Sequence, residues 1–265
     1  MNNPIALLPM YDWPEIHDAT NKYWSSLREA LAEQGFTPPE YLSRADDPFL
    51  LWRSPQLLIA QTCGLPFVEH LSADVSLIGT PAYDIDCGAG SYFSVIVVHN
   101  DSSIETCADL NGAALAYNDP LSQSGAAAFF SHLHTSGIPV NKIARFERVM
   151  SHRNAIQQLS ERKVDVAAID AVTWELAMRH ERATGCLRII GQTLPTPGLP
   201  YITTRRPKAE VDRIHRAVVE AIVSLPGSIR NDLLLTGFAA TTSADYQFIK
   251  NSYDLVRDRM DTCLT

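Results

Sequence analysis

Apolar and polar positions along the chain form short runs and periodic stretches that predict strands followed by helices. Apolar runs that suit buried strands occupy residues 5–8, 57–60, 75–79, 92–98, 113–117, 144–150, 164–169, 187–190 and 201–204. After the first run, Ile16, Ala19, Tyr23, Leu27 and Leu31 recur with the spacing of one helical face. Further helices are predicted near 126–133, 155–159, 174–177, 208–225, 228–236 and 243–260. This order of strands and helices predicts an α/β fold.

Two irregular segments interrupt the pattern and suggest that the chain forms two lobes. Residues 84–92 are rich in glycine and residues 192–200 are rich in proline. A chain of 265 residues is also longer than a single core usually requires. We therefore expect a discontinuous first lobe (1–84 and 201–265), a second lobe (92–192), and hinge crossovers at 84–92 and 192–200.

The turn after the strand at 113–117 carries groups that suit a small anion. Ser122 and Ser124 supply two hydroxyls, and Gly125 lets a ligand approach the backbone. We expect the amides of Ser124, Gly125 and Ala126 to point unpaired from the start of a helix, where the backbone dipoles attract negative charge. An ordinary serine N-cap is the alternative that the pattern leaves open.

Other polar residues follow further strands, where ligands of open α/β sheets bind. Tyr11 follows the first strand, Gln61 and Thr62 follow the second, and His152 and Asp170 follow two strands of the second lobe. We expect these residues to meet around one ligand in a cleft between the lobes. His152 and Asp170 are equally compatible with a helix cap, and core packing is the common alternative for Tyr11 and Tyr92.

Composition narrows the classes of partner. The net charge of −8 disfavours nucleic acid and anionic membranes, and no apolar run is long enough to insert into a membrane. The five cysteines are scattered, which suggests a reducing compartment. His132 and His134 point to different helix faces, so we expect no metal site. We also expect no cofactor. No signal peptide is recognised, so the expected location is cytoplasmic as the sequence stands, or periplasmic if a signal peptide was removed.

Several separated blocks resemble the substrate-binding proteins of phosphate, phosphite and phosphonate ABC transporters, which have the type 2 periplasmic binding protein fold. The blocks are 58–66, 77–81, 118–125, 151–152, 165–170 with Trp174, and 197–201. The resemblance implies two lobes, each with a central mixed sheet, joined by a two-segment hinge.

The resemblance also implies roles for individual residues. The serine-rich turn would hold the phosphonate oxygens, which assigns that role to Ser122, Ser124, Gly125 and Ala126. His152 matches a histidine of the family, Asp170 would face the distal group of the ligand, and Tyr11 and Tyr92 would supply aromatic contacts. Gln61 and Thr62 are assigned from their strand-end position, with the resemblance as support.

We therefore expect a protein that closes on a small oxyanion such as phosphate, phosphite or an organophosphonate and performs no chemistry. It would serve as the receptor of an ABC-type uptake system, with a permease as partner, or as a soluble sensor. The alternative is a cytoplasmic enzyme of the same fold that acts on a carboxylated metabolite, similar to chorismate dehydratase, with Asp170 or His152 as general acid or base.

Overall fold

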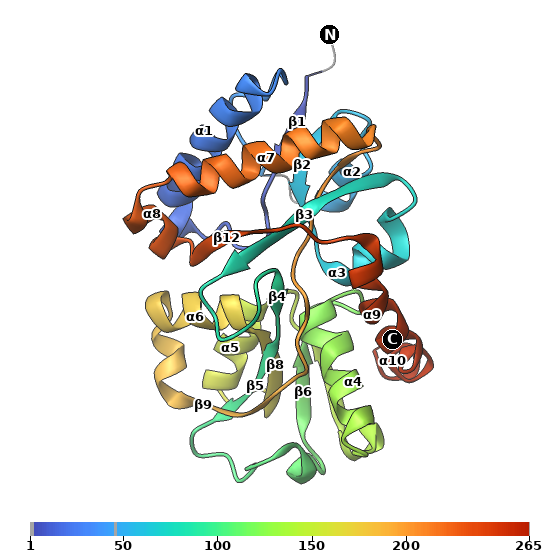
Figure 1. Ribbon diagram of the computed structural model, residues 1–265. Helices are drawn as coiled ribbons and strands as arrows, with labels where there is room; N and C mark the ends of the chain where they lie inside the picture. Colours follow the sequence, from blue (N-terminus) through green and yellow to red (C-terminus); the bar gives the residue numbers. More distant parts are fainter. Residues whose placement is uncertain (1–2, 45–46, 265) are drawn as a thin grey trace. The chain divides into compact units, whose positions relative to one another are not determined.

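The computed structural model describes residues 3–44 and 47–264, and these form two compact units (Figure 1). Unit 1 contains residues 1–91 and 197–247, and unit 2 contains residues 92–196 and 248–265. The ends of the predicted first lobe, residues 1–2 and 265, lie outside the described residues. The α/β class with a mixed sheet in each unit confirms the predicted fold class.

Unit 1 is built on a five-stranded sheet with the order β1-β2-β11-β3-β12. Its strands are β1 (Ile5–Leu7), β2 (Leu57–Gln61), β3 (Val75–Tyr83), β11 (Tyr201–Thr204) and β12 (Leu235–Ala239). β1 and β2 are parallel, whereas β11 runs antiparallel to its neighbours β2 and β3. β2 is buried at every position, as the apolar run 57–60 predicts, and its last residue, Gln61, is a buried polar side chain.

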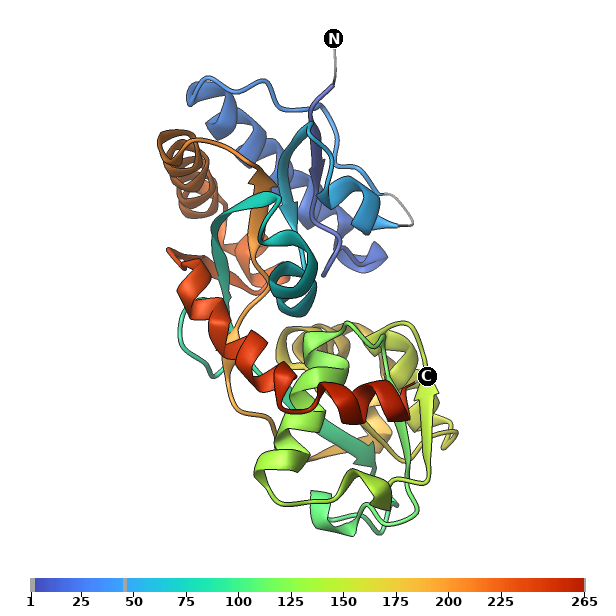
Figure 2. The ribbon, with the colours of Figure 1, turned by 90° about the vertical axis from the view of Figure 1, so that its right-hand side faces the viewer.

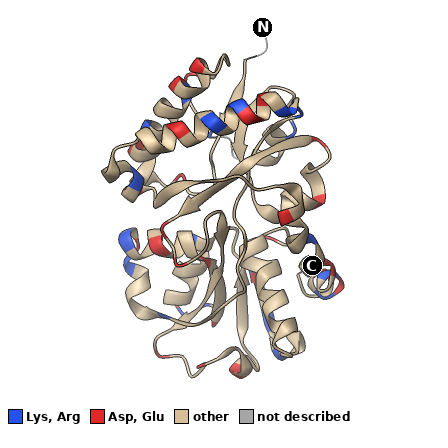
Figure 3. Cartoon of the chain, viewed as in Figure 1, with Lys and Arg blue, Asp and Glu red and all other residues tan. Residues whose placement is uncertain are grey.

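Two long helices of unit 1 lie side by side in both views of the ribbon, α1 (His17–Glu33) and α7 (Lys208–Ser224) (Figures 1 and 2). Leu27, Leu31, Ile214 and Val218 from these helices are buried in one apolar cluster with the strands. Charged residues alternate with uncharged ones along both helices (Figure 3), as in amphipathic helices. The remaining helices of this unit are α2 (Pro48–Trp52), α3 (Gly64–Pro66), which continues as a π-helical turn at Phe67–Leu71, and α8 (Gly227–Asp232).

Unit 2 is built on a second five-stranded sheet with the order β7-β6-β8-β5-β9. Its strands are β5 (Ser94–His99), β6 (Ala114–Tyr117), β7 (Arg145–Arg148), β8 (Val166–Asp170) and β9 (Leu187–Gln192). β6 is parallel to both β7 and β8, whereas β5 runs antiparallel to β8 and β9. The helices of the unit are α4 (Ala128–Thr135), α5 (His152–Ser160), α6 (Ala171–His180) and α10 (Arg257–Cys263), and α9 (Ser243–Asp254) begins in unit 1 and ends in unit 2.

The chain passes between the units at three places, and two of these places include short paired strands. β4 (Ser91–Tyr92) and β10 (Thr196–Pro197) form a two-stranded sheet, and the Gly198 amide donates to the Gly90 carbonyl at 2.8 Å. These positions fall within the predicted crossovers at 84–92 and 192–200. Their function as a hinge stays a prediction.

The C-terminal segment differs from the sequence expectation. Residues 248–265 belong to unit 2 and not to the first lobe, because the Tyr117 hydroxyl donates to the Leu264 carbonyl at 3.2 Å and Ser131 Oγ donates to the Ser252 carbonyl at 3.3 Å. The single helix predicted at 243–260 is also divided, since Val256 has a non-helical φ of −121° between α9 and α10.

The predicted helix at 228–236 is wrong in its second half. That part begins β12, which pairs with β3, and β3 itself continues past Thr80 to Tyr83. A Cβ atom on Gly79 would lie 2.6 Å from the Ala239 carbonyl oxygen, and Gly79 has a φ of +151°. Glycine at this position therefore permits the close approach of β12, a tertiary effect that helical spacing does not reveal.

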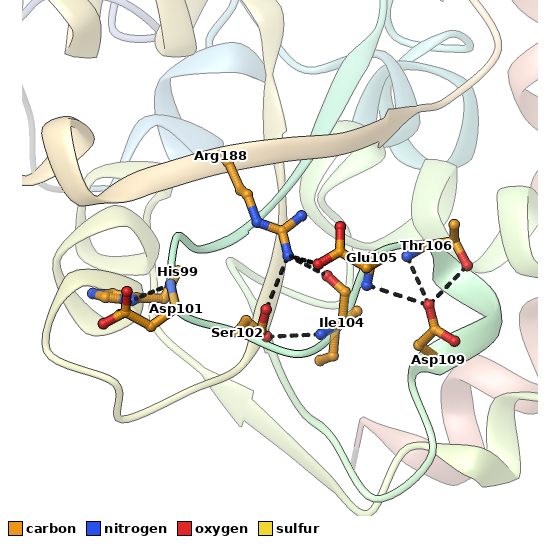
Figure 4. A network of polar contacts seen from close by, with 8 residues as sticks. All are labelled: His99, Asp101, Ser102, Ile104, Glu105, Thr106, Asp109 and Arg188. Carbon is orange, nitrogen blue, oxygen red and sulfur yellow. Dashed lines mark hydrogen bonds and ion pairs between the residues drawn. The ribbon is translucent and has the colours of Figure 1, made fainter.

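A polar network fixes the loop after β5 to β9 within unit 2 (Figure 4). The Arg188 Nη2 atom donates at 2.9 Å to the carbonyls of Ser102 and Ile104 and to the Glu105 carboxylate. Thr106 and Asp109 close the same loop through a reciprocal capping box. The network therefore supports the loop structure.

The helices of the described part of the chain are too short or too polar to cross a membrane. All five cysteines are free thiols.

Candidate functional site

Three parallel strands of unit 2 bring the predicted site residues to one edge of the sheet. β7, β6 and β8 are neighbours and point the same way, so their carboxyl ends lie together. The serine-rich turn follows β6, His152 begins α5 after β7, and Asp170 is the last residue of β8. The strand-end reasoning therefore predicted this cluster correctly in position, whereas ligand contact by its members stays a prediction.

The serine-rich turn has a more closed backbone than the sequence suggested. Ser122 is the N-cap of a π-helical turn (Gln123–Ala127) that continues into α4, and its Oγ accepts a hydrogen bond from the Gly125 amide at 3.0 Å. The Ala126 amide donates to the Ser122 carbonyl at 3.2 Å. The expectation that the amides of Gly125 and Ala126 point unpaired is therefore wrong, because the cap itself uses them.

Ser124 contacts another element of unit 2 through its side chain. It is 7% exposed, and its Oγ lies 2.9 Å from Nε2 of His152. Its carbonyl accepts a hydrogen bond from Ser94 Oγ at 3.0 Å. Ser124 is thus held from both sides, which fixes the direction in which its hydroxyl is presented.

His152 lies between the serine and a carboxylate. Its Nε2 atom is 3.3 Å from Oδ2 of Asp170 and also contacts Ser124 Oγ. Burial lowers the pKa of His152, and the Asp170 carboxylate opposes this shift only in part. The imidazole is therefore neutral at pH 7, and the proton on Nε2 is the arrangement that best suits the nearby carboxylate oxygen.

Asp170 has the helix-capping role that the sequence left open. It is 3% exposed, and its Oδ1 atom accepts a hydrogen bond from the Thr173 amide at 2.9 Å at the start of α6. Because Oδ2 faces His152, one carboxylate both caps a helix and forms a wall of the cluster.

The residues predicted in unit 1 lie at the corresponding edge of the other sheet. Tyr11 packs edge-on against Tyr83 with ring centroids 5.2 Å apart, and Gln61 Nε2 donates to the Tyr83 hydroxyl at 3.0 Å. Tyr11, Gln61 and Tyr83 line a pocket of about 40 Å³, enough for two or three water-sized groups. Thr62 is fully buried, and its amide donates to the Pro200 carbonyl at 3.0 Å.

Tyr92 is only 2% exposed and belongs to β4, at the start of unit 2. Its burial agrees with the packing alternative, and its ligand contact stays a prediction.

His132 and His134 are the histidine pair that we do not expect to bind a metal. His134 has its Nδ1 atom 2.9 Å from Nη1 of Arg259. Among the described residues, no three side chains of His, Cys, Asp or Glu form a group that would hold a metal ion.

Sequence reasoning missed Ser94 and Asn118 as parts of the cluster. Ser94 pairs with Asp170 across the antiparallel strands β5 and β8, a register that the sequence does not specify. The feature of the sequence that could have pointed to Ser94 is its position as a polar residue at the start of the otherwise apolar run 94–98. Asn118 directly follows β6, and it is the first polar residue of the turn.

One protein family matches most of the chain. The sequence profile of the family described as "ABC transporter, phosphonate, periplasmic substrate-binding protein" matches residues 17–246. A search of curated proteins gives no significant match.

Solved structures show the same fold at low sequence identity. A binding protein component of an ABC phosphonate transporter from Pseudomonas aeruginosa has a TM-score of 0.74 and 18% identity, covering 98% of this chain and 88% of that one. PhnD1 from Prochlorococcus marinus, in complex with methylphosphonate, has a TM-score of 0.74 and 15% identity, covering 96% of this chain and 98% of that one. XAC2383 from Xanthomonas citri, bound to chloride ion, has a TM-score of 0.74 and 20% identity, covering 97% of this chain and 100% of that one.

Proposed function

Because this chain belongs to the family of periplasmic substrate-binding proteins of phosphonate ABC transporters, we propose that it binds a small phosphorus oxyanion and releases it unchanged. Phosphate, phosphite and short organophosphonates are the compounds in question. The similarity to PhnD1, which was solved with methylphosphonate, supports this ligand class.

The observation that carries the proposal is the buried Ser124 hydroxyl beside His152. The contacts that Ser94, Ser122 and Ser124 make among the described residues involve neither Lys nor Arg. An oxyanion would therefore be held by hydroxyl groups and backbone dipoles, a means of binding that suits a ligand that must be released again.

Arg148, which follows the same sheet edge, forms an ion pair with Asp119 of the turn. This ion pair neutralises the charge of Arg148, so the donors proposed for the ligand are side-chain hydroxyls and the His152 imidazole. We assign the oxyanion contacts to Ser122, Ser124 and His152. The other predicted ligand contacts remain predictions, each to be tested by its own substitution. They are Tyr11, Gln61, Thr62, Tyr92, Gly125, Ala126 and Asp170.

The geometry of the serine, histidine and aspartate argues against nucleophilic catalysis. In a hydrolase triad the serine and the carboxylate contact opposite nitrogens of the imidazole, so that one orients the ring while the other loses its proton. Here Ser124 Oγ and Asp170 Oδ2 both face Nε2. This arrangement lacks the relay that would make Ser124 a nucleophile, and it favours binding over turnover.

The family also supports a location and a partner. We infer that the protein works in the periplasm and delivers its ligand to an ABC transporter permease. Movement of the two units at residues 84–92 and 192–200 would report ligand occupancy to that permease by favouring the ligand-bound conformation.

The test is a calorimetric titration of methylphosphonate into the wild-type protein and two serine variants. Ser124→Ala removes a hydrogen bond to a charged ligand, so the affinity should fall at least about tenfold. Ser136→Ala, an exposed serine at the other end of α4, is the matched control and should bind like the wild type. An unchanged affinity of Ser124→Ala would overturn the assignment.

A further inference from the structure

We propose that Asn118 is a further ligand-binding residue and that its carboxamide oxygen accepts a hydrogen bond from a protonated oxygen of the oxyanion. The site would then prefer the singly charged form of a phosphorus oxyanion to the doubly charged form. This inference rests on the proposed function and adds to it the protonation state of the ligand.

The backbone ties Asn118 to two segments of the candidate site. The residue follows Tyr117, the last residue of β6, and its carbonyl accepts a hydrogen bond from the Met150 amide at 3.0 Å. Met150 precedes Ser151 and His152, so this bond ties the serine-rich turn to the segment that positions the histidine. Asn118 is therefore fixed by the same framework as Ser124 and His152.

The side chain of Asn118 lies flat against Gly125. A Cβ atom on Gly125 would be 2.8 Å from Cγ of Asn118 and 3.0 Å from both its Nδ2 and its Oδ1. The 2.8 Å contact is shorter than real Cβ atoms make, and the two at 3.0 Å are tighter than most of their contacts. Glycine at position 125 therefore makes room for the Asn118 carboxamide, which lies directly beside the turn that carries Ser122 and Ser124.

The carboxamide oxygen of Asn118 lacks a donor. Oδ1 is buried and has no hydrogen-bond partner among the described residues. Leaving a buried acceptor unpaired costs about 1–3 kcal/mol, so such groups are usually explained by a missing partner. A ligand bound at this turn would supply the donor.

The charged and titratable groups around the turn do not supply that donor. Asp119 pairs with Arg148 of β7, the Asp170 carboxylate is an acceptor, and Nε2 of His152 is engaged by Ser124 and Asp170. Glu147 of β7 pairs with Arg145, and the Tyr117 hydroxyl donates to Leu264. The acceptors at the site therefore call for a ligand that carries a proton.

The ionisation of the ligand makes this requirement measurable. Phosphorus oxyanions lose their second proton near neutral pH, and the doubly charged form offers only acceptors. A sulfonate at neutral pH also carries no proton. The Asn118 oxygen would thus discriminate both against the phosphorus dianion and against sulfonates.

The experiment measures the dissociation constant of methylphosphonate between pH 6.5 and 8.5, where the lowered pKa keeps His152 neutral. For the wild type, the affinity should fall about tenfold per pH unit once the second pKa of the ligand is exceeded. Asn118→Ala should bind about tenfold more weakly at pH 6.5 and show a flatter pH profile. Asn118→Asp, which retains an acceptor oxygen, should keep the slope although its added charge weakens binding.

Controls separate this inference from the proposed function. Asn141→Ala, an exposed asparagine of unit 2, should reproduce the wild-type profile, and methanesulfonate should bind the wild type less tightly than methylphosphonate. An affinity that rises with pH would show that the amide group donates to a dianion and would overturn the inference, as would identical profiles for the wild type and Asn118→Ala. If methylphosphonate, phosphate and phosphite all fail to bind the wild type at every pH, the proposed function fails as well.

Discussion

A single imidazole nitrogen connects the two polar side chains that define the candidate site of unit 2. Ser124 Oγ and Asp170 Oδ2 lie 2.9 and 3.3 Å from Nε2 of His152. Strand-end reasoning identified all three residues, because the carboxyl ends of parallel strands are predictable from their order. It did not identify Ser94, whose place depends on the antiparallel register of β5 and β8, nor the donors that the cap at Ser122 uses internally.

The lowered pKa of His152 predicts a pH-dependent stability. The unfolded chain binds a proton at the ordinary pKa of 6.5, whereas the folded protein binds it only at lower pH. The neutral buried His152 therefore makes its full contribution to the free energy of unfolding above pH 6.5. This contribution is lost as the pH falls toward the pKa of His152 in the folded protein. The slope cannot exceed about 1.4 kcal/mol per pH unit for one proton.

Urea denaturation of the ligand-free protein at pH 7.5 and 5.5 measures this loss. His152→Gln should lose less stability between these two pH values than the wild type does. Asp109, Asp245 and Asp254 have pKa values below 3.8, so their contributions change at lower pH. Equal losses in the two proteins would contradict a neutral buried His152.

At the scale of elements, helical periodicity and apolar runs predicted most strands and helices of both sheets. The failures have tertiary causes. β12 forms because Gly79 lets it approach β3, and the chain leaves α9 and enters α10 at Val256. In both cases the local pattern is compatible with a continuous helix. Contacts with β3 in the first case and with unit 2 in the second determine the structure that forms.

The assignment of α10 to unit 2 predicts a local effect of a core substitution. Met260 is 1% exposed, so Met260→Ala should reduce the free energy of unfolding by about 2–5 kcal/mol. Leu255→Ala, at a side chain that is 65% exposed, should change it by about 0.5 kcal/mol or less. Hydrogen exchange should show the loss of protection in unit 2, for example in β6 and β8, and a loss confined to unit 1 would restore the sequence-based assignment of 248–265.

At the scale of the whole molecule, the chain has the fold and the family membership that its motifs predicted. Each unit has a mixed sheet with polar residues at one edge, the edge where parallel strands end. The identity of the ligand is the property that the sequence and the fold specify least, because the same fold supports binding proteins and enzymes.

Thermal unfolding against a panel of ligands tests the central claim most directly, since a ligand that binds only the folded protein raises its melting temperature. The panel comprises phosphate, phosphite, methylphosphonate, 2-aminoethylphosphonate, methanesulfonate and chorismate. We predict that at least one phosphorus oxyanion raises the melting temperature and that the shift is lost in Ser124→Ala but kept in Ser136→Ala. A shift with chorismate alone, accompanied by its turnover, would contradict the binding function and favour the enzyme.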